Sequence, residues 1–552
     1  MKYKVYLRDW YFNAGIIGFL KIIADGRKLE DISYLVFGEN YIEFNDDIFN
    51  GFEEKFIKHV FLKFFNVEAY LKRLQKAQQD LKDKKTKINQ KQIVKKIGEI
   101  EKPPYKDFLK LLKIDISINK SVDNFIANLE NAKKYIKSLN KETIFEKLNS
   151  IPEGRKSLQK FSEEKLKGLS SYKKERISEY IKKLKKTNPS KKLKNNKLCP
   201  SCQERKAEVD FNNAVSNIIG FNKDNSNWIW GFKSAKLNIC PLCAIIYICA
   251  FASFWYISKK VDKNYLNYFY FPNANTTVKN LYEEIKEFNL VLDNIQDNND
   301  MLYEMIKHTV VHIVRKQSKS IAENINFIEI ADNPILAGQS SKGYNVYNYN
   351  IMPDIAEFLD EQFKASNIPK GYYIITINKT KKTFYSIQDE LLKKAIRRQI
   401  DYSTLYRYFV FFLYSDRYTA NYDLKKVMKF VIKYIQSMRG GNMEQEKSQT
   451  IVKKGFKSGI VLRDAILKKG KENQINGLVY GFLNDLKVAD REKFLDKYIR
   501  VNMSYEQPIM FGQDEMLDDD YFLQFGYSFV NGLMSKSKEM EENTVNNKKE
   551  GE

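Results

Sequence analysis

Histidine is scarce in this 552-residue chain, which contains only His59, His308 and His312. The last two are four residues apart on a predicted helix, but Thr309 stands where an H-E-x-x-H metal site requires glutamate, so we expect a structural pair. Residues 440–443, Gly-Gly-Asn-Met, lack both carboxylates of a cyclase GGDD loop, which leaves two-metal catalysis unsupported. A Walker loop, a G-x-G-x-x-G fingerprint and a G-x-S-x-G elbow are also missing. These absences predict a binding scaffold and not an enzyme.

Long hydrophobic runs are absent as well. The longest apolar run, residues 242–257, has 16 residues, whereas a membrane-spanning helix needs about 20. It begins inside a Cys-Pro-Leu-Cys sequence, which favours a buried core helix. The N-terminus, MKYKVYLRDWYFNAG, lacks the basic start and apolar core of a signal peptide. We therefore expect a soluble, cytoplasmic protein.

The cysteines are few but ordered. Four of the five form two Cys-Pro-x-Cys pairs, Cys199 with Cys202 and Cys240 with Cys243. Each pair presents two thiolates on one tight turn, and two such turns supply the four sulfurs of a tetrahedral structural Zn²⁺ site, whose occupancy can be partial. Two disulfides or four unrelated buried thiols are the alternatives, but disulfides need an oxidising compartment, so zinc is favoured. Cys249 has apolar neighbours and is expected to be a buried thiol.

The spacing between the two cysteine pairs is long. The 37 residues between Cys202 and Cys240 exceed the usual spacing of roughly 15–20, which predicts a small inserted subdomain. This segment contains no histidine. The zinc site is therefore expected to be structural.

The charge is strongly positive and unevenly distributed. Lys and Arg number 93 against 69 Asp and Glu, a net charge of +24, which favours an anionic partner such as nucleic acid. Residues 151–198 carry a net +11, whereas residues 443–552 carry −2. A genome rich in A and T, or the solvated face of a long helix, would also produce lysine runs. The candidate nucleic-acid contacts are Lys182, Lys183, Lys185, Lys186, Lys453, Lys454, Lys457, Arg463, Lys468 and Lys469.

Acidic side chains gather near the C-terminus, with no histidine nearby. They predict a helix start or a charged surface rather than a metal site. They are Asp514, Glu515, Asp518, Asp519 and Asp520.

Hydrophobic periodicity predicts an α+β multidomain protein with an inserted four-cysteine zinc subdomain and a C-terminal all-helical bundle. The N-terminal residues predict a strand over 3–7 and a hairpin over 34–44. Between them they predict a helix from Trp10, with Gly15 and Gly18 on one face where another backbone can approach closely. Strand signals end before residue 387. The expected segments are an N-terminal α+β region with basic helices (1–195), a zinc-knuckle subdomain (196–260), an α+β region (261–386), a helical bundle (387–534) and a disordered tail (535–552).

Three blocks in this order resemble one family. They are D-W-x-x-N-A-G-I-x-G-F-L from Asp9, the paired CPxC sequences, and FLQFGYSFVNGL from Phe522. The chain resembles, over about residues 1–534, the large subunit of a type I-B CRISPR Cascade surveillance complex of the Cst type. The CPxC pairs alone occur in many zinc proteins, so the order of the blocks carries the specificity.

The resemblance implies crRNA-guided DNA surveillance. The large subunit would bind near the crRNA 5′ end, recognise the protospacer-adjacent motif on duplex DNA, support R-loop formation and recruit the helicase-nuclease, beside backbone and crRNA-end subunits of Cascade. The match does not locate a motif-reading residue. A stand-alone zinc-containing RNA-binding or ribosome-associated protein would share the charge and the cysteines, and a nuclease would show metal-dependent cleavage.

The junction around Arg439-Gly440-Gly441 predicts a second product of the same gene. These codons can spell a purine-rich ribosome-binding sequence shortly before Met443, and the resemblance implies that such genes encode a small subunit in this way. Translation from Met443 would yield residues 443–552, with Met438 and Met428 as weaker starts. An ordinary turn between two helices explains the same residues equally well.

Overall fold

A computed structural model describes residues 2–66, 139–166, 174–186, 198–211, 238–261, 264–293, 301–317, 325–332, 344–378, 381–414, 421–439 and 445–535, with isolated residues between them. Most of the segment between the cysteine pairs, the junction at residues 440–444 and the tail from residue 536 lie outside the described residues. The predictions made for those segments are therefore untested.

The chain divides into two compact units. The first comprises residues 1–258, 266–289 and 328–347, and the second comprises residues 259–265, 290–327 and 348–552. This division differs from the five segments expected from the sequence. In particular, the second cysteine pair shares the first unit with the N-terminal helix, because the helix that begins at that pair packs along it.

The first unit opens with a small antiparallel sheet in the order β1-β3-β2, formed by β1 (Lys2–Tyr6), β2 (Leu35–Phe37) and β3 (Tyr41–Asn45). Tyr3 and Val5 are buried while their neighbours are more exposed, as alternation in a one-sided sheet requires. The predicted strand and hairpin are thus confirmed. Two short 3₁₀ turns flank the hairpin, η1 (Leu29–Asp31) and η2 (Asp46–Phe49).

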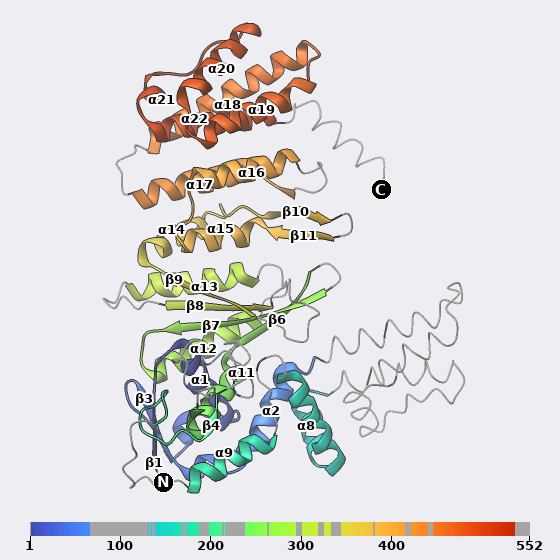
Figure 1. Ribbon diagram of the computed structural model, residues 1–552, viewed down its shortest axis with the longest axis vertical. Coiled ribbons are helices and arrows are strands. Elements are labelled where there is room, and N and C mark those ends of the chain that lie inside the picture. The colour runs from blue at the N-terminus through green and yellow to red at the C-terminus, as the bar shows by residue number, and fades with distance from the viewer. Residues whose placement is uncertain are drawn as a thin grey trace, which may run out of the picture. The chain divides into compact units, whose positions relative to one another are not determined.

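Two buried helices, α1 (Trp10–Ala24) and α11 (Pro241–Ser253), form the centre of this unit (Figure 1). A Cβ atom placed on Gly15 would lie 2.4 Å from the carbonyl oxygen of Ile246, and one on Gly18 would lie 1.9 Å from that of Cys249. Only glycine allows this approach. The close-approach role predicted for the two glycines is confirmed.

Further helices and short strands complete the first unit. The helix α2 packs against α7 and α8, and α9 packs against α11. Their bounds are α2 (Phe52–Phe64), α7 (Lys141–Asn149), α8 (Pro152–Leu166) and α9 (Lys174–Lys186), and the two-residue strands β4 (Val209–Asp210) and β5 (Asn238–Ile239) pair near the cysteines.

A four-stranded sheet in the order β6-β7-β8-β9 follows, accompanied by two helices. The predicted core helix over 242–257 is wrong at its end, because Phe254 has an extended backbone and residues 255–257 begin a strand rich in β-favouring aromatic and branched residues. The bounds are β6 (Trp255–Val261), β7 (Asn264–Ala274), α12 (Val278–Asp293), α13 (Met301–Gln317), β8 (Ile325–Asp332) and β9 (Tyr344–Ile351). The helix predicted to carry His308 and His312 is α13.

From residue 348 onward, the second unit contains alternating helices and strands. Its sheet has the order β11-β10-β12, and β12 corrects the expectation that strands end at residue 387. This strand has only two residues, too few for a period-two pattern. The bounds are α14 (Pro353–Lys364), β10 (Gly371–Asn378), β11 (Lys381–Ser386), α15 (Ile387–Ile396), α16 (Tyr402–Tyr414), β12 (Asn421–Tyr422) and α17 (Leu424–Arg439).

The predicted C-terminal helical region is present and is centred on α18 (Gln445–Lys468) and α22 (Asp519–Met534), joined by α19 (Asn473–Lys487), α20 (Arg491–Ser504) and α21 (Gln513–Leu517) (Figure 1). A Cβ on Gly459 would lie 2.0 Å from the Phe529 carbonyl oxygen, and one on Gly532 would lie 2.2 Å from that of Phe456. This helix pair is therefore also packed backbone to backbone. Among the described residues, none of the helices has the length and apolar character needed to cross a membrane.

Candidate metal centre and basic surfaces

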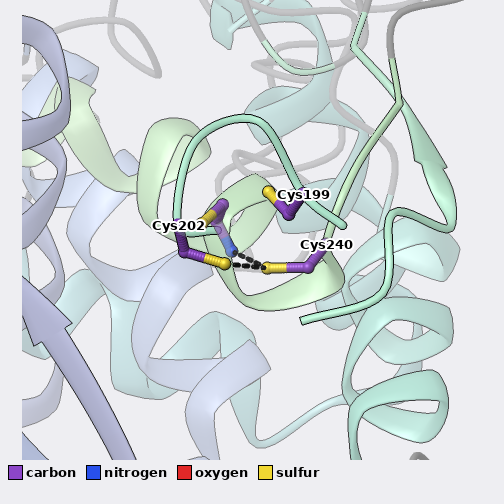
Figure 2. Close-up of side chains that lie close together, drawn as sticks. Cys199, Cys202 and Cys240 are labelled. Carbon is purple, nitrogen blue, oxygen red and sulfur yellow. Dashed lines mark hydrogen bonds between the residues drawn. The ribbon is translucent and has the colours of Figure 1, made fainter. Parts of the chain in front are cut away.

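Four buried cysteines meet at one point in the first unit (Figure 2). One ligand atom from each of Cys199, Cys202, Cys240 and Cys243 lies within 4.8 Å of the others, and the Sγ atoms of Cys202 and Cys240 are 3.7 Å apart. A tetrahedral site with metal–sulfur bonds of about 2.3 Å separates its sulfurs by about 3.8 Å. All four side chains are free thiols rather than disulfides. The donor set and its spacing fit a four-sulfur metal site.

Local backbone structure places each thiol. The first pair sits on a tight turn, in which the Gln203 amide donates to the Cys199 carbonyl at 2.7 Å and the Cys199 amide donates to the Arg205 carbonyl at 2.7 Å. In the second pair Cys240 is the N-cap of α11, and its Sγ accepts the Cys243 amide proton at 3.4 Å. Helix N-termini favour negative charge, so the start of α11 stabilises thiolate sulfur.

Two arginines join the first cysteine turn to the N-terminal strand region. Arg8 donates to the carbonyl and, at 3.1 Å, to the hydroxyl of Ser201, while Arg205 donates to the Lys4 carbonyl at 3.4 Å. Burial lowers the pKa of Arg205, but the negative charge of nearby thiolates, led by Cys240, outweighs it and the pKa is raised. The first cysteine turn is thus fixed to β1 and to the start of α1 as well as to its partner pair.

The pKa values of the four thiols are shifted in different directions by their neighbours. Hydrogen bonds from Cys199, Cys240 and Cys243 stabilise the Cys202 thiolate and lower its pKa far below the usual value. Hydrogen bonds with neighbouring thiols, Cys199 first, and then burial raise the pKa of Cys240 and of Cys243. Although its hydrogen bond with Cys202 raises it, those with Cys240 and Cys243 lower the pKa of Cys199 to about 7. The first cysteine pair therefore forms thiolates more readily than the second, whose protons a bound cation would replace.

Cys249 does not belong to this cluster. It lies in the middle of α11, is fully buried, and has a pKa raised by that burial. Its carbonyl oxygen is the atom that Gly18 of α1 approaches. The expectation of a buried thiol is confirmed.

The predicted basic residues of α9 lie on its solvent side. Lys182, Lys185 and Lys186 are exposed, and Lys183 forms an ion pair with Glu179 at 2.6 Å. Apolar residues on the opposite side, such as Leu184, are buried. The helix therefore presents its lysines together while its apolar side packs inward.

The predicted basic residues of α18, and Lys469 just after it, differ in their exposure and in their partners. Lys453, Lys457 and Lys468 are exposed, and Lys469 is exposed while donating to the Ser504 carbonyl at 3.2 Å. The other two differ: Lys454 forms an ion pair within the bundle, and Arg463 is buried.

Arg463 and Lys454 correct the prediction. Arg463 is 6% exposed and donates to the Ser535 carbonyl at 2.6 Å, so it cannot be presented to a phosphate backbone. Lys454 pairs at 2.7 Å with Glu515, whose side chain is 1% exposed. The sequence signal for the burial of Arg463 is its position between Leu462 and Ile466, on the apolar side of the helix.

The acidic cluster near the C-terminus starts helices, as predicted. Asp518 is the N-cap of α22 and accepts the Tyr521 amide proton at 2.9 Å. Glu515 accepts the Gly512 amide proton at 3.0 Å at the start of α21.

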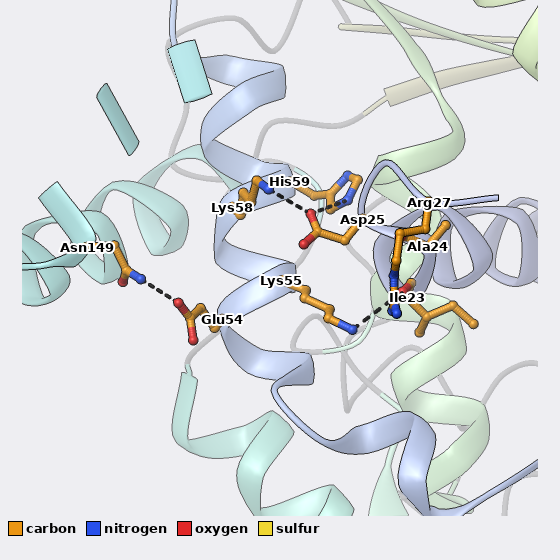
Figure 3. Close-up of polar contacts among 9 residues, drawn as sticks. All are labelled: Ile23, Ala24, Asp25, Arg27, Glu54, Lys55, Lys58, His59 and Asn149. Atoms are coloured by element: carbon orange, nitrogen blue, oxygen red, sulfur yellow. Dashed lines mark hydrogen bonds and ion pairs between the residues drawn. The ribbon is translucent and has the colours of Figure 1, made fainter. Parts of the chain in front are cut away.

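A basic cluster at the C-terminus of α1 was not predicted (Figure 3). Lys58 pairs with Asp25 at 3.0 Å, and Lys55 and Arg27 donate to the last carbonyls of the helix at 3.5 and 3.4 Å. Burial lowers the pKa of His59 to about 4, and Lys58 adds to the effect although Asp25 opposes it. Cations stabilise helix C-termini, so this cluster is structural.

No family model, curated protein or solved structure matches the chain.

Proposed function

We propose that the chain is the large subunit of a type I-B CRISPR surveillance complex, positioned near the crRNA 5′ end, where it recognises the protospacer-adjacent motif, supports R-loop formation and recruits the helicase-nuclease. The observation that carries the proposal is that its first two family-like blocks form one buried structure. Asp9 caps α1 by accepting two amide protons at 3.0 Å, and Gly15 and Gly18 admit α11, which begins at the second cysteine pair. The residues that make the resemblance are thus the ones this fold requires.

The third block supports the same proposal through the second unit. Within FLQFGYSFVNGL, Gln524 is fully buried and accepts the Ser448 hydroxyl at 2.6 Å, and Gly532 admits the backbone of α18. Every residue of this block is buried. The block therefore supports a shared fold, whereas nucleic-acid binding must come from residues outside it.

The metal in this proposal is a structural Zn²⁺ held by the four cysteines. When bound, it would neutralise thiolate charge and fix the two turns to one another. The chain's own residues do the rest, because Arg8 and Arg205 tie the first turn to β1 and α11 carries the second turn into the core. We assign no catalytic role to the chain.

The proposed nucleic-acid contacts are the exposed lysines of α9 and α18. A net charge of +24 and lysine side chains held outward from packed helices suit binding to a phosphate backbone through counterion release. Lys182, Lys185 and Lys186 are the strongest set, because they share one exposed helix end. Lys453, Lys457 and Lys468 are the second set.

The small-subunit proposal concerns Met443, which precedes α18 by two residues. The helices α18 to α22 pack largely on one another, as a separately made subunit would require. Expression of the unmodified gene with a C-terminal tag tests this. A short band beginning at Met443, lost when that codon is changed to Leu and the preceding Gly codons are recoded, is expected; a single full-length band would reject it.

Co-purification tests the main proposal. The tagged chain, purified from its host lysate without added nucleic acid, is expected to bring crRNA and repeated backbone subunits. Ribosomes or ribosomal RNA would instead support the alternative of a stand-alone zinc-containing RNA-binding protein. A lone protein with metal-dependent cleavage would identify a nuclease.

Charge reversal tests the α9 surface. Changing Lys182, Lys185 and Lys186 to Glu is expected to weaken target-DNA binding and to lower the log–log salt slope by roughly 0.9 for each lost duplex phosphate contact. The matched control reverses Lys286, Lys493 and Arg500, exposed cations that each already pair with a nearby carboxylate that is not buried. Equal effects of the two triple variants on DNA binding would show that the α9 lysines face solvent and do not contact nucleic acid.

A further inference from the structure

A groove of about 660 Å³ lies between α14, α17 and α18 in the second unit. Its cationic residues sit on two of the three helices, and its remaining wall combines apolar side chains with the uncharged polar side chains of Gln362, Gln436, Ser437, Ser448 and Gln449. The lining includes Lys425, Lys429, Lys433 and Lys453 together with Phe358, Met428, Ile432, Val452 and Phe456.

The lysines of α17 form a regular row along this groove. Lys425, Lys429 and Lys433 follow at four-residue spacing, which places them on one side of the helix over about 12 Å. Among the described residues, none of these three side chains pairs with a carboxylate, and neither does Lys453. The lining contains one carboxylate, Glu361. The groove therefore carries a net positive charge.

A buried amide adds an independent signal. Gln362 of α14 lines the groove and is 2% exposed, yet its Oε1 has no hydrogen-bond partner among the described residues. An unpaired buried acceptor is costly unless a ligand supplies a donor. A backbone or side-chain N–H group of a bound molecule would satisfy it.

The aromatic residues favour a protein ligand over a nucleic acid. Single-stranded nucleic acids stack their bases on open aromatic faces. Here Phe358 is 3% exposed and packs at 5.5 Å against Phe430, and the ammonium group of Lys425 covers the Phe456 ring at 5.3 Å. The groove offers bases little stacking surface, whereas the half-buried Val452 can contact an apolar side chain of a ligand.

We propose that this groove docks a segment of a partner protein, an amphipathic helix with acidic residues at four-residue spacing and apolar residues beside them. The acids would pair with the α17 lysines, and about two or three apolar side chains would occupy a space of this volume. This binding goes beyond the proposed function, because it needs neither guide RNA nor target DNA, and it shares only Lys453 with the proposed nucleic-acid contacts.

The test uses the full chain and a fluorescein-labelled helical peptide of roughly 16 residues built from Glu-Glu-Leu-Leu repeats. We expect Lys429→Glu to weaken binding about tenfold, because an attraction becomes a repulsion. The matched control is Lys426→Glu, which changes an exposed lysine of the same helix outside the groove and is expected to alter binding less than about twofold.

Two further probes separate the possible outcomes. A peptide with Ser in place of Leu should bind at least about tenfold more weakly, because apolar contact is lost; equal binding would reduce the groove to a nonspecific charge and overturn the proposal. A thymidine oligonucleotide should bind the Lys429→Glu and Lys426→Glu variants equally. A selective loss of oligonucleotide binding in Lys429→Glu, with no peptide binding, would assign the groove to nucleic acid. Co-purification of crRNA should be unchanged in either variant, which separates this proposal from the proposed function.

Discussion

The helix pair α1–α11 in the first unit and the pair α18–α22 in the second unit are packed in the same way but are stabilised by different interactions. Both bring backbones together at glycines, Gly15 and Gly18 in one pair, Gly459 and Gly532 in the other. The first pair ends at four buried thiols. The second is held by side-chain hydrogen bonds, such as the one that the Ser448 hydroxyl donates to Gln524 Oε1 at 2.6 Å. Close packing is thus common to both, whereas, of the two, only the first ends at a thiol cluster that could hold a metal ion.

Metal removal should separate the two pairs most strongly. We expect a chelator, or Cys202→Ser, to lower the opening free energy of α11 and the first cysteine turn by more than about 5 kcal/mol, because metal binding is coupled to folding there. Amide hydrogen exchange of α18 and α22 should not change. Elemental analysis should find about one zinc per chain in the unaltered protein.

The control for metal removal is Cys249→Ala, which changes a buried thiol outside the cluster and should leave metal content intact. A freshly purified, chelator-free sample without metal would contradict the prediction.

Glycine substitutions should affect the two pairs alike. Gly18→Ala and Gly459→Ala would each force a Cβ to within about 2 Å of a carbonyl oxygen, so we expect each to destabilise its own pair by about 3 kcal/mol. Gly477→Ala is the matched control, because its Cβ meets open space on an exposed face of α19, and there we expect a gain of about 0.5–1 kcal/mol. Exchange rates resolved by peptide would locate each effect; equal results for all three variants would refute the packing argument.

The ion pair between Lys454 and the buried carboxylate of Glu515 lies in the second unit. Lys454→Met would leave the carboxylate of Glu515 buried without its cation and should cost about 3 kcal/mol in the bundle. The double variant Lys454→Met with Glu515→Gln should recover much of this loss, because the buried charge is removed. Denaturant unfolding of the single and double variants measures the difference. If Lys454→Met changed the salt dependence of DNA binding, this lysine would contact nucleic acid after all.

The smallest expected effect is a pH dependence in the first unit. Burial holds the pKa of His59 at about 4 in the folded protein, whereas the unfolded chain takes up this proton near pH 6.5. The free energy of unfolding should therefore fall as the pH is lowered from about 6.5 to about 4, by about 1–2 kcal/mol because the side chain is partly exposed. His59→Gln should remove this part of the pH slope without changing metal content. The helices α18–α22 contain no histidine and serve as the internal reference.

The sequence predicted the elements with strong periodicity and the cysteine cluster, for identifiable reasons. Thiols at a fixed short spacing can bind a metal in only a few arrangements. Two glycines three residues apart on an apolar helix indicate that another backbone packs closely against it. What α1 packs against was not predictable, because the partner lies more than 200 residues away. The ties from Arg8 to Ser201 and from Lys454 to Glu515 were also missed, because their partners are 193 and 61 residues apart and no short-range pattern links them.

Individual charged residues were the least predictable part of the site. Lysines in a run have the same sequence signature whether they face solvent, as Lys457 does, or pair with a carboxylate, as Lys454 does. The basic groove was missed because its wall comes from three helices, and only Lys453 belonged to a predicted basic set.

The contact between α1 and α11 also sets an order of events during synthesis. A ribosome adding about 5–20 residues per second needs roughly 10 to 45 seconds between completing α1 and completing α11. Over that interval the Gly15–Gly18 face of α1 has no α11 to receive it. The corresponding wait between α18 and α22 is roughly 3 to 13 seconds. The N-terminal helix, although made first, cannot reach its native packing until nearly half of the chain has been translated.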